Sequence, residues 1–150
     1  MNNSPVITDA GIIVGLIYQK DQWHKWAKEQ SKHLLPPFLT CESVITEACF
    51  LLQDISDGEQ NVLGMIADGY LQIDFSLSDE VESVKFLMKK YDSVPMSLAD
   101  ACLVRMSEQY ENSVVFTVDG DFVIYRKNGK QEIPLIIPDE KVKARNKRTN

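Results

Sequence analysis

Carboxylates stand at strand and helix ends that are far apart in the sequence. Asp9 directly follows a short apolar strand predicted near the N-terminus, and Asp119 and Asp121 follow a second predicted strand. Asp100 lies in the first turn of the helix predicted just before that second strand. The carboxyl ends of the strands in an open parallel sheet share one edge, so these side chains can converge in one cleft. Oxygen ligands suit hard divalent cations such as Mg²⁺, and the pattern therefore predicts a metal site.

Glu47 is a further carboxylate, on the apolar helix predicted over residues 41–52. No Lys or Arg lies within four positions of it along the chain. A carboxylate in apolar surroundings is costly unless its charge is compensated. A cation shared with Asp9 and Asp100 would compensate that charge, which makes Glu47 the most informative single residue for a metal site.

Each of these carboxylates also has an ordinary structural interpretation. The alternatives are an N-cap for Asp9, a capping box with Ser97 for Asp100, a turn at Asp119-Gly120, the cap of a short turn for Asp121 and an exposed helix position for Glu47. The joint pattern favours the site, because separate structural accidents would otherwise have to coincide at one sheet edge. Asp74 is left out, because the alternation in LQIDF places it on the solvent face of a strand.

The composition is that of a single globular domain. Of 150 residues, 44% are apolar and 25% are charged. No apolar run approaches the roughly 20 residues of a membrane span. The N-terminal residues do not resemble a signal peptide, which predicts a cytoplasmic protein without a membrane partner. The cysteines at 41, 49 and 102 show no metal-binding or disulfide spacing, and we interpret them as buried apolar residues in a reducing compartment.

The charge is distributed unevenly along the chain. The formal net charge is −6, to which residues 141–150 contribute +5 and no acid, so that residues 1–140 carry −11. So acidic a body excludes a generic nucleic-acid binder, and any nucleic acid would need metal ions and local basic residues to offset the field. We expect residues 141–150 to be a basic, disordered tail; contact with phosphates is the alternative.

Strands and helices alternate along the chain. Short strands are expected at 6–8, 38–39, 71–75, 114–116 and 133–137, with helices between them. Pro134, at the start of the last strand, is typical of a sheet edge. This order predicts an α/β fold, a three-layer α/β/α sandwich with a mainly parallel central sheet, in one domain over residues 1–140.

The segments that carry the acids resemble the PIN-domain family, in particular its VapC-type ribonuclease toxins. The matching pieces, in order along residues 5–138, are VITDAG, LTCESVITEACFLL, SLADACLVRM and VFTVDGDF. Two features common in the family are missing, because Ala10 stands where many members have Ser or Thr and Ser97 where many have Asp. These departures affect a supporting hydroxyl and one extra carboxylate, and leave the core acids in place.

The resemblance implies roles for the individual acids around Mg²⁺ or Mn²⁺. Asp9 and Asp100 would be the primary metal ligands. Glu47 and Asp119 would complete the acidic pocket, directly or through water. Two further residues would assist them, Asp121 as an additional contributor and Thr117 as a hydroxyl that orients a carboxylate or a water.

The function implied is a metal-dependent endoribonuclease, the toxin of a toxin–antitoxin pair. Its partners would be an RNA substrate, an antitoxin protein and a second copy of the chain in a homodimer. The alternative is a PIN-like binding module or RNA-processing factor that acts through a protein partner. The strand followed by D-x-D also resembles the nucleophile motif of haloacid-dehalogenase-type phosphatases, but we expect this alternative less, because that motif needs a long downstream chain and only about thirty residues follow Asp119.

Overall fold

A parallel five-stranded sheet forms the centre of the computed structural model, which describes residues 3–149. The strand order is β3-β2-β1-β4-β7, and each pair of neighbours runs parallel. The strands are β1 (Val6–Thr8), β2 (Phe38–Thr40), β3 (Leu71–Ile73), β4 (Val114–Phe116) and β7 (Leu135–Ile136). The predicted parallel sheet is confirmed, and so is the placement of the strand after Pro134 at its edge.

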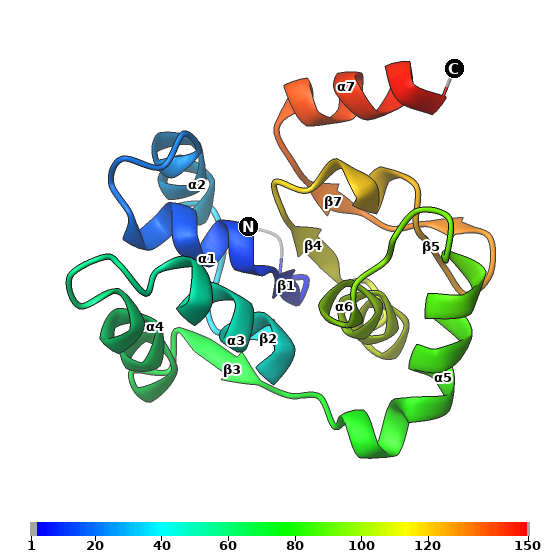
Figure 1. Cartoon of the computed structure of the whole chain (residues 1–150), viewed down its shortest axis with the longest axis horizontal. Helices are drawn as coiled ribbons and strands as arrows, with labels where there is room; N and C mark the ends of the chain where they lie inside the picture. The colour runs from blue at the N-terminus through cyan, green and yellow to red at the C-terminus, as the bar shows by residue number, and fades with distance from the viewer. Residues whose placement is uncertain (1–2, 150) are drawn as a thin grey trace.

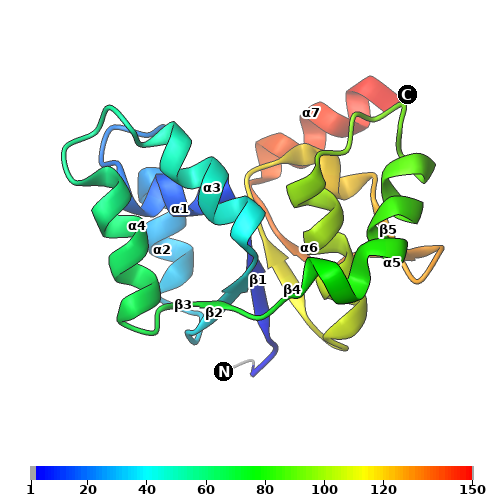
Figure 2. The same cartoon turned by 60° about the horizontal axis from the view of Figure 1, so that its bottom comes forward.

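Helices cover both sides of this sheet. Figures 1 and 2 show α1 to α4 gathered on one side and α5 to α7 on the other. Their bounds are α1 (Ala10–Ile17), α2 (His24–Ser31), α3 (Glu42–Leu51), α4 (Gly58–Ala67), α5 (Leu77–Lys90), α6 (Leu98–Gln109) and α7 (Asp139–Thr149). This is the predicted α/β/α arrangement. Among residues 3–149, no helix has the length and apolar character needed to cross a membrane.

The core is built on β1 and β4, which lie in the middle of the sheet. All three residues of β1 are buried, as expected for a parallel strand covered on both faces. The ring of Phe116 on β4 packs 5.7 Å from Trp26 and 6.0 Å from Phe38, measured between ring centroids. The parallel pairing of β1 with β4 places the carboxyl ends of these two strands side by side.

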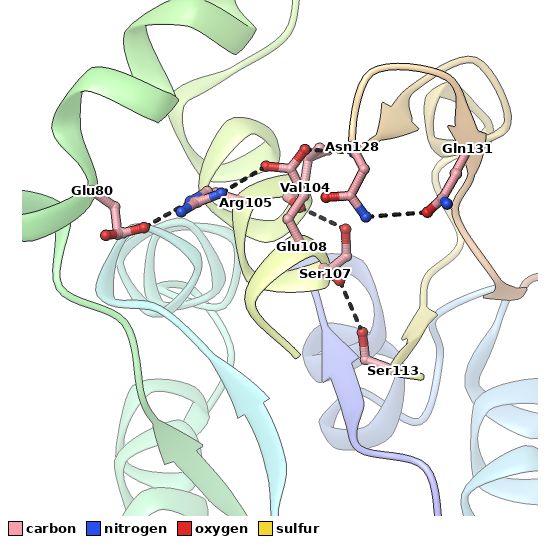
Figure 3. Close-up of polar contacts among 8 residues, drawn as sticks. All are labelled: Glu80, Val104, Arg105, Ser107, Glu108, Ser113, Asn128 and Gln131. Atoms are coloured by element: carbon pink, nitrogen blue, oxygen red, sulfur yellow. Dashed lines mark hydrogen bonds and ion pairs between the residues drawn. The ribbon is translucent and has the colours of Figure 1, made fainter. Parts of the chain in front are cut away.

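A polar network joins α5, α6 and the hairpin of β5 (Arg126–Lys127) and β6 (Gln131–Glu132), which the sequence did not predict (Figure 3). Arg105 on α6 donates to Glu80 on α5 at 2.7 Å and to Glu108 at 3.2 Å. Glu108 also accepts the backbone N–H of Asn128, in the hairpin turn, at 2.7 Å. One arginine and two carboxylates therefore connect three segments on this side of the sheet.

The C-terminal end differs from the sequence prediction. Residues 141–150 were expected to be disordered, but all of them except Asn150, which lies outside the described residues, belong to α7. Asp139 and Glu140 in its first turn favour a helix there, because negative charges stabilise the N-terminal end of the helix dipole. The helix packs on the short 3₁₀ helix η1 (Gly120–Val123). The contact could not be predicted from the sequence, because residues 141–150 show no amphipathic pattern.

Candidate acidic active site

Asp9 and Asp119 leave the sheet at the same edge, because their strands are neighbours. Thr8, the last residue of β1, pairs with Phe116, the last residue of β4. Asp9 caps α1, and its Oδ1 accepts the N–H of Ile12 at 3.2 Å. The predicted N-cap role is thus real, and it leaves the second carboxylate oxygen of Asp9 facing the loop after β4.

Thr117 connects the two acids through its hydroxyl. This hydroxyl donates to Oδ2 of Asp9 and accepts the backbone N–H of Asp119 at 2.9 Å. The approach of α1 to this loop is close, since a Cβ on Gly11 would lie 2.7 Å from Cγ2 of Val118. The backbone packing and the hydroxyl together fix how the Asp9 carboxylate is turned.

Asp100 enters from the start of α6. Its N–H donates to the Ser97 hydroxyl at 3.0 Å, which confirms the capping interaction. Its carboxylate is engaged separately, since Oδ2 accepts the Tyr125 hydroxyl at 2.9 Å. Capping and a place in the acidic site are therefore compatible for Asp100. Sequence reasoning missed Tyr125, because an aromatic residue in the apolar run after Asp121 gave no sign of a polar role.

Burial and mutual repulsion raise the pKa values of these acids. Burial raises the pKa of Asp9 to about 7; the bonds from Thr117 and Ile12 oppose the rise, and the charges of Asp119 and Asp100 add to it. Burial raises the pKa of Asp100 to about 6, and Asp119 adds to this as well. The pKa of Asp119 is also raised, first by burial. Asp119 is therefore close enough to Asp9 and to Asp100 for its charge to disfavour the ionised form of both.

Glu47 lies at the outer side of this group, on α3. Its side chain is more exposed than that of Asp9, yet burial and the charge of Asp119 both raise its pKa. Thr117 joins Asp9 to Asp119, and the charge of Asp119 reaches Asp100 and Glu47; a metal site shared by the four acids stays a prediction. Asp74, which we left out, is exposed and accepts the Tyr110 hydroxyl instead.

Asp121 differs from the other acids in having a cationic partner. Its Oδ1 lies 3.4 Å from Nε of Arg145 on α7, and the two side chains are 31% and 18% exposed. Its backbone N–H donates to Oδ1 of Asp119 at 2.9 Å. Asp121 thus borders the acidic group, but its carboxylate is turned to the C-terminal helix.

The donor set suits a hard cation that keeps most of its water. As positioned, no three His, Cys, Asp or Glu side chains among residues 3–149 stand close enough to hold one ion directly. Mg²⁺ does not require this, because it commonly binds through one or two carboxylates and several waters. The groups that bond to the carboxylates of Asp9 and Asp100 are hydroxyls and backbone N–H groups, which carry no net charge. A cation would lower the cost of ionising these buried acids.

A hollow elsewhere in the fold does not mark this site. It has a volume of about 700 Å³ and lies between α1, α2 and α4. Its lining includes Leu16, Ile17, Met65 and Tyr70. Leu16 and Ile17 form the C-terminal end of α1, away from Asp9 at its other end. The volume of this hollow does not identify it as the functional site, because a metal site for a polymer substrate needs carboxylate oxygens at an accessible edge.

The chain is similar to a known protein in its structure, whereas comparisons of its sequence find no match. No family model matches the chain, and no curated protein has a significantly similar sequence. The structure resembles that of Mycobacterium tuberculosis VapC20, described as a sarcin–ricin loop cleaving toxin, with a TM-score of 0.69. The match covers 85% of this chain and 98% of that one at 19% identity. At this identity it shows the fold alone, and the predicted PIN-like architecture is confirmed.

Proposed function

We propose that the chain is a metal-dependent endoribonuclease that hydrolyses RNA phosphodiester bonds. The observation that carries the proposal is the placement of Asp9, Asp100 and Asp119 at the carboxyl edge of a VapC-like sheet. Thr117 bonds to both Asp9 and Asp119, and the charge of Asp119 raises the pKa of Asp9 and of Asp100. Placing buried carboxylates near one another costs stability, and a bound divalent cation would offset their charge. Acids with such raised pKa values are typical of functional sites. Hydrolysis would leave a 5′-phosphate and a 3′-hydroxyl.

Asp9 and Asp100 would hold Mg²⁺ or Mn²⁺, with Asp119 and Glu47 completing the shell directly or through water. When bound, the cation would lower the pKa of an attacking water and offset charge that develops on the phosphate. The chain's own groups set the orientation. Thr117 turns the Asp9 carboxylate by donating to it, and Tyr125 does the same for Asp100.

The fold suggests the first substrate to test. Because VapC20 is described as cleaving the sarcin–ricin loop, we propose a structured RNA stem–loop as substrate and the toxin of a toxin–antitoxin pair as the biological role. A cytoplasmic location would follow from that role.

Exposed apolar side chains favour protein partners. Phe50 and Leu51 on α3 are 66% and 53% exposed, and Phe86 on α5 is 67% exposed. Exposed apolar side chains that form a patch are typical of contact surfaces, and Phe50 and Leu51 are adjacent on α3. We propose a homodimer and an antitoxin as the partners, and light scattering of the purified chain, alone and co-expressed with a candidate antitoxin, tests both.

The decisive experiment is cleavage of a panel of stem–loop RNAs, a sarcin–ricin hairpin among them, with mapped ends. We expect cleavage with Mg²⁺ or Mn²⁺ and none in EDTA. Asp100→Asn should abolish it, whereas Asp74→Asn, the same change at an exposed acid, should leave it intact. Thermal melting of every variant shows that loss of cleavage is not loss of fold. Undiminished cleavage by Asp100→Asn, or cleavage in EDTA, would overturn the proposal.

A further inference from the structure

The loop that carries Asp119 and Asp121 is built to receive the C-terminal helix. A Cβ added to Gly120 would lie 3.1 Å from the carbonyl oxygen of Lys141 and 3.4 Å from Cβ of Arg145. Contacts this short mean that α7 lies directly on the loop. The basic end of the chain is therefore placed beside the acidic site and is not free in solvent.

Two cations on α7 face this site from one side of the helix. Lys141 and Arg145 are four residues apart, and such residues lie on the same helical face. Nζ of Lys141 stands 5.8 Å from the ring centroid of Trp23, at the start of α2. Both cations lower the pKa of Asp119, so their fields reach the acidic group. Lys143 lies on the opposite side of the helix and is exposed.

The uneven charge along the chain indicates what Lys141 and Arg145 could bind. Residues 1–140 carry −11 and residues 141–150 carry +5, so an RNA backbone approaching the acidic edge meets strong repulsion except along α7. Phosphate contacts by Lys and Arg supply most of the sequence-independent affinity for nucleic acids. The planar guanidinium of arginine matches phosphate oxygens when a neighbour fixes its orientation.

We propose that α7 docks the RNA backbone, with Lys141 and Arg145 as phosphate-binding residues and Asp121 as the positioning residue that holds Arg145. This inference rests on the proposed nuclease function, because RNA is the ligand in both. It gives Asp121 a part distinct from that of the acids that would bind metal. The competing possibility is that Arg145 is a brake that occupies the site until it is displaced.

Measuring RNA binding without cleavage distinguishes a docking role of Arg145 from a role as a brake. A fluorescein-labelled stem–loop RNA is titrated in EDTA with the Asp100→Asn protein, by anisotropy over a range of salt concentrations. Adding Arg145→Gln should weaken binding about tenfold and reduce the slope of log affinity against log salt by about 0.7 to 0.9, the share of one phosphate. Lys143→Gln, which removes the same charge from the outer side of α7, should change affinity less than twofold. Arg145→Lys should restore part of the loss.

The Asp121→Asn variant tests whether RNA affinity rises or falls when this carboxylate loses its charge. Loss of a negative charge beside a polyanion would by itself strengthen binding, whereas loss of the group that positions Arg145 should weaken it, to nearly the level of Arg145→Gln. Stronger binding by Asp121→Asn, or equal affinity of Arg145→Gln and Lys143→Gln, would overturn the inference. So would faster cleavage by Arg145→Gln in the otherwise unaltered enzyme, which would identify a brake. If the unaltered enzyme binds RNA but cleaves none of the panel, the nuclease function fails and the binding comparisons still decide the role of α7.

Discussion

The hydroxyl of Tyr125 donates a hydrogen bond of 2.9 Å to Oδ2 of Asp100. Tyr125 is fully buried, and its pKa is raised by burial and by the charge of Asp100, so its proton stays in place across the physiological range. The bond in turn lowers the pKa of Asp100 and opposes the rise caused by burial. Tyr125 therefore both aims this carboxylate and helps keep it ionised.

Tyr125→Phe should move the pH dependence of cleavage. A hydrogen bond is worth about 0.5–1.5 kcal/mol, so its loss should raise the pKa of Asp100 by roughly half to one unit, since one unit equals about 1.4 kcal/mol. The acid limb of the pH–rate profile should shift upward by that amount. Tyr110→Phe is the control, because it removes the same kind of bond, to Asp74 at an exposed position. An unmoved profile in Tyr125→Phe would show that Asp100 does not control the limb.

Asp9 should make the metal-free protein less stable as the pH rises. Its pKa is about 7 in the folded protein against an ordinary 3.8, so the folded state holds the proton more tightly than the unfolded state. The stability that this gives is complete below the lower value and is lost as the pH rises through the higher one. The free energy of unfolding in EDTA should therefore fall by a few kcal/mol between pH 4 and about 7, since each pKa unit is worth about 1.4 kcal/mol.

Asp9→Asn isolates this contribution, because asparagine keeps the shape of the side chain and cannot ionise. The fall in unfolding free energy between pH 4 and about pH 7 should become shallower. Adding Mg²⁺ near neutral pH should stabilise the unaltered protein, by about 2.7 kcal/mol at 100 times Kd, and the Asn variant much less. Urea unfolding at several pH values measures each quantity. An equally steep fall in the Asn variant would assign the pH dependence to other groups.

The position of Asp9 at the carboxyl edge of the sheet was predictable, because it depends only on which residues follow one another along the chain. Asp9 follows an apolar strand directly, and parallel strands end on one side, so its place could be stated without coordinates. Asp100 shows that a local signal can be correct and incomplete: the Ser97 cap is real, but the cap says nothing of where the carboxylate points. The capping role of Asp100 and its place among the acids are therefore compatible.

The supporting contacts could not be predicted, because they depend on tertiary packing. Tyr125 reaches Asp100 only because η1 turns the chain back towards α6. Arg145 reaches Asp121 only because the basic end folds as α7, and composition alone favoured disorder there. The β5–β6 hairpin was missed because each strand has only two residues, too few for a periodic pattern.

Gly120→Ala should loosen α7. The new methyl group would lie 3.1 Å from the Lys141 carbonyl oxygen, so the helix must shift, at a cost of about 1 kcal/mol or more. Proteolysis within α7 should speed up. Gly64→Ala, in α4 with nothing within 4 Å of the new methyl, should instead stabilise by about 0.5–1 kcal/mol, because alanine favours helix. Equal behaviour of the two variants would mean that the Gly120 contact carries no constraint.

Arg105→Gln should destabilise the side of the domain opposite α1 to α4 without touching the site. Arg105 is 29% exposed and bonds to Glu80 and Glu108, which are only 18% and 12% exposed. Its loss leaves two poorly solvated carboxylates facing each other, which should cost roughly 1–3 kcal/mol of unfolding free energy.

Lys85→Gln is the control for Arg105→Gln. Lys85 pairs with Glu82 at 3.8 Å, but both side chains are at least 70% exposed, and such surface pairs contribute little. Urea unfolding should give a lower midpoint for Arg105→Gln with an unchanged slope, and no measurable change for Lys85→Gln. RNA cleavage should be unchanged in both at temperatures where both are folded. A loss of cleavage by the folded Arg105→Gln protein would show that the network of Figure 3 also positions Asp100 through α6.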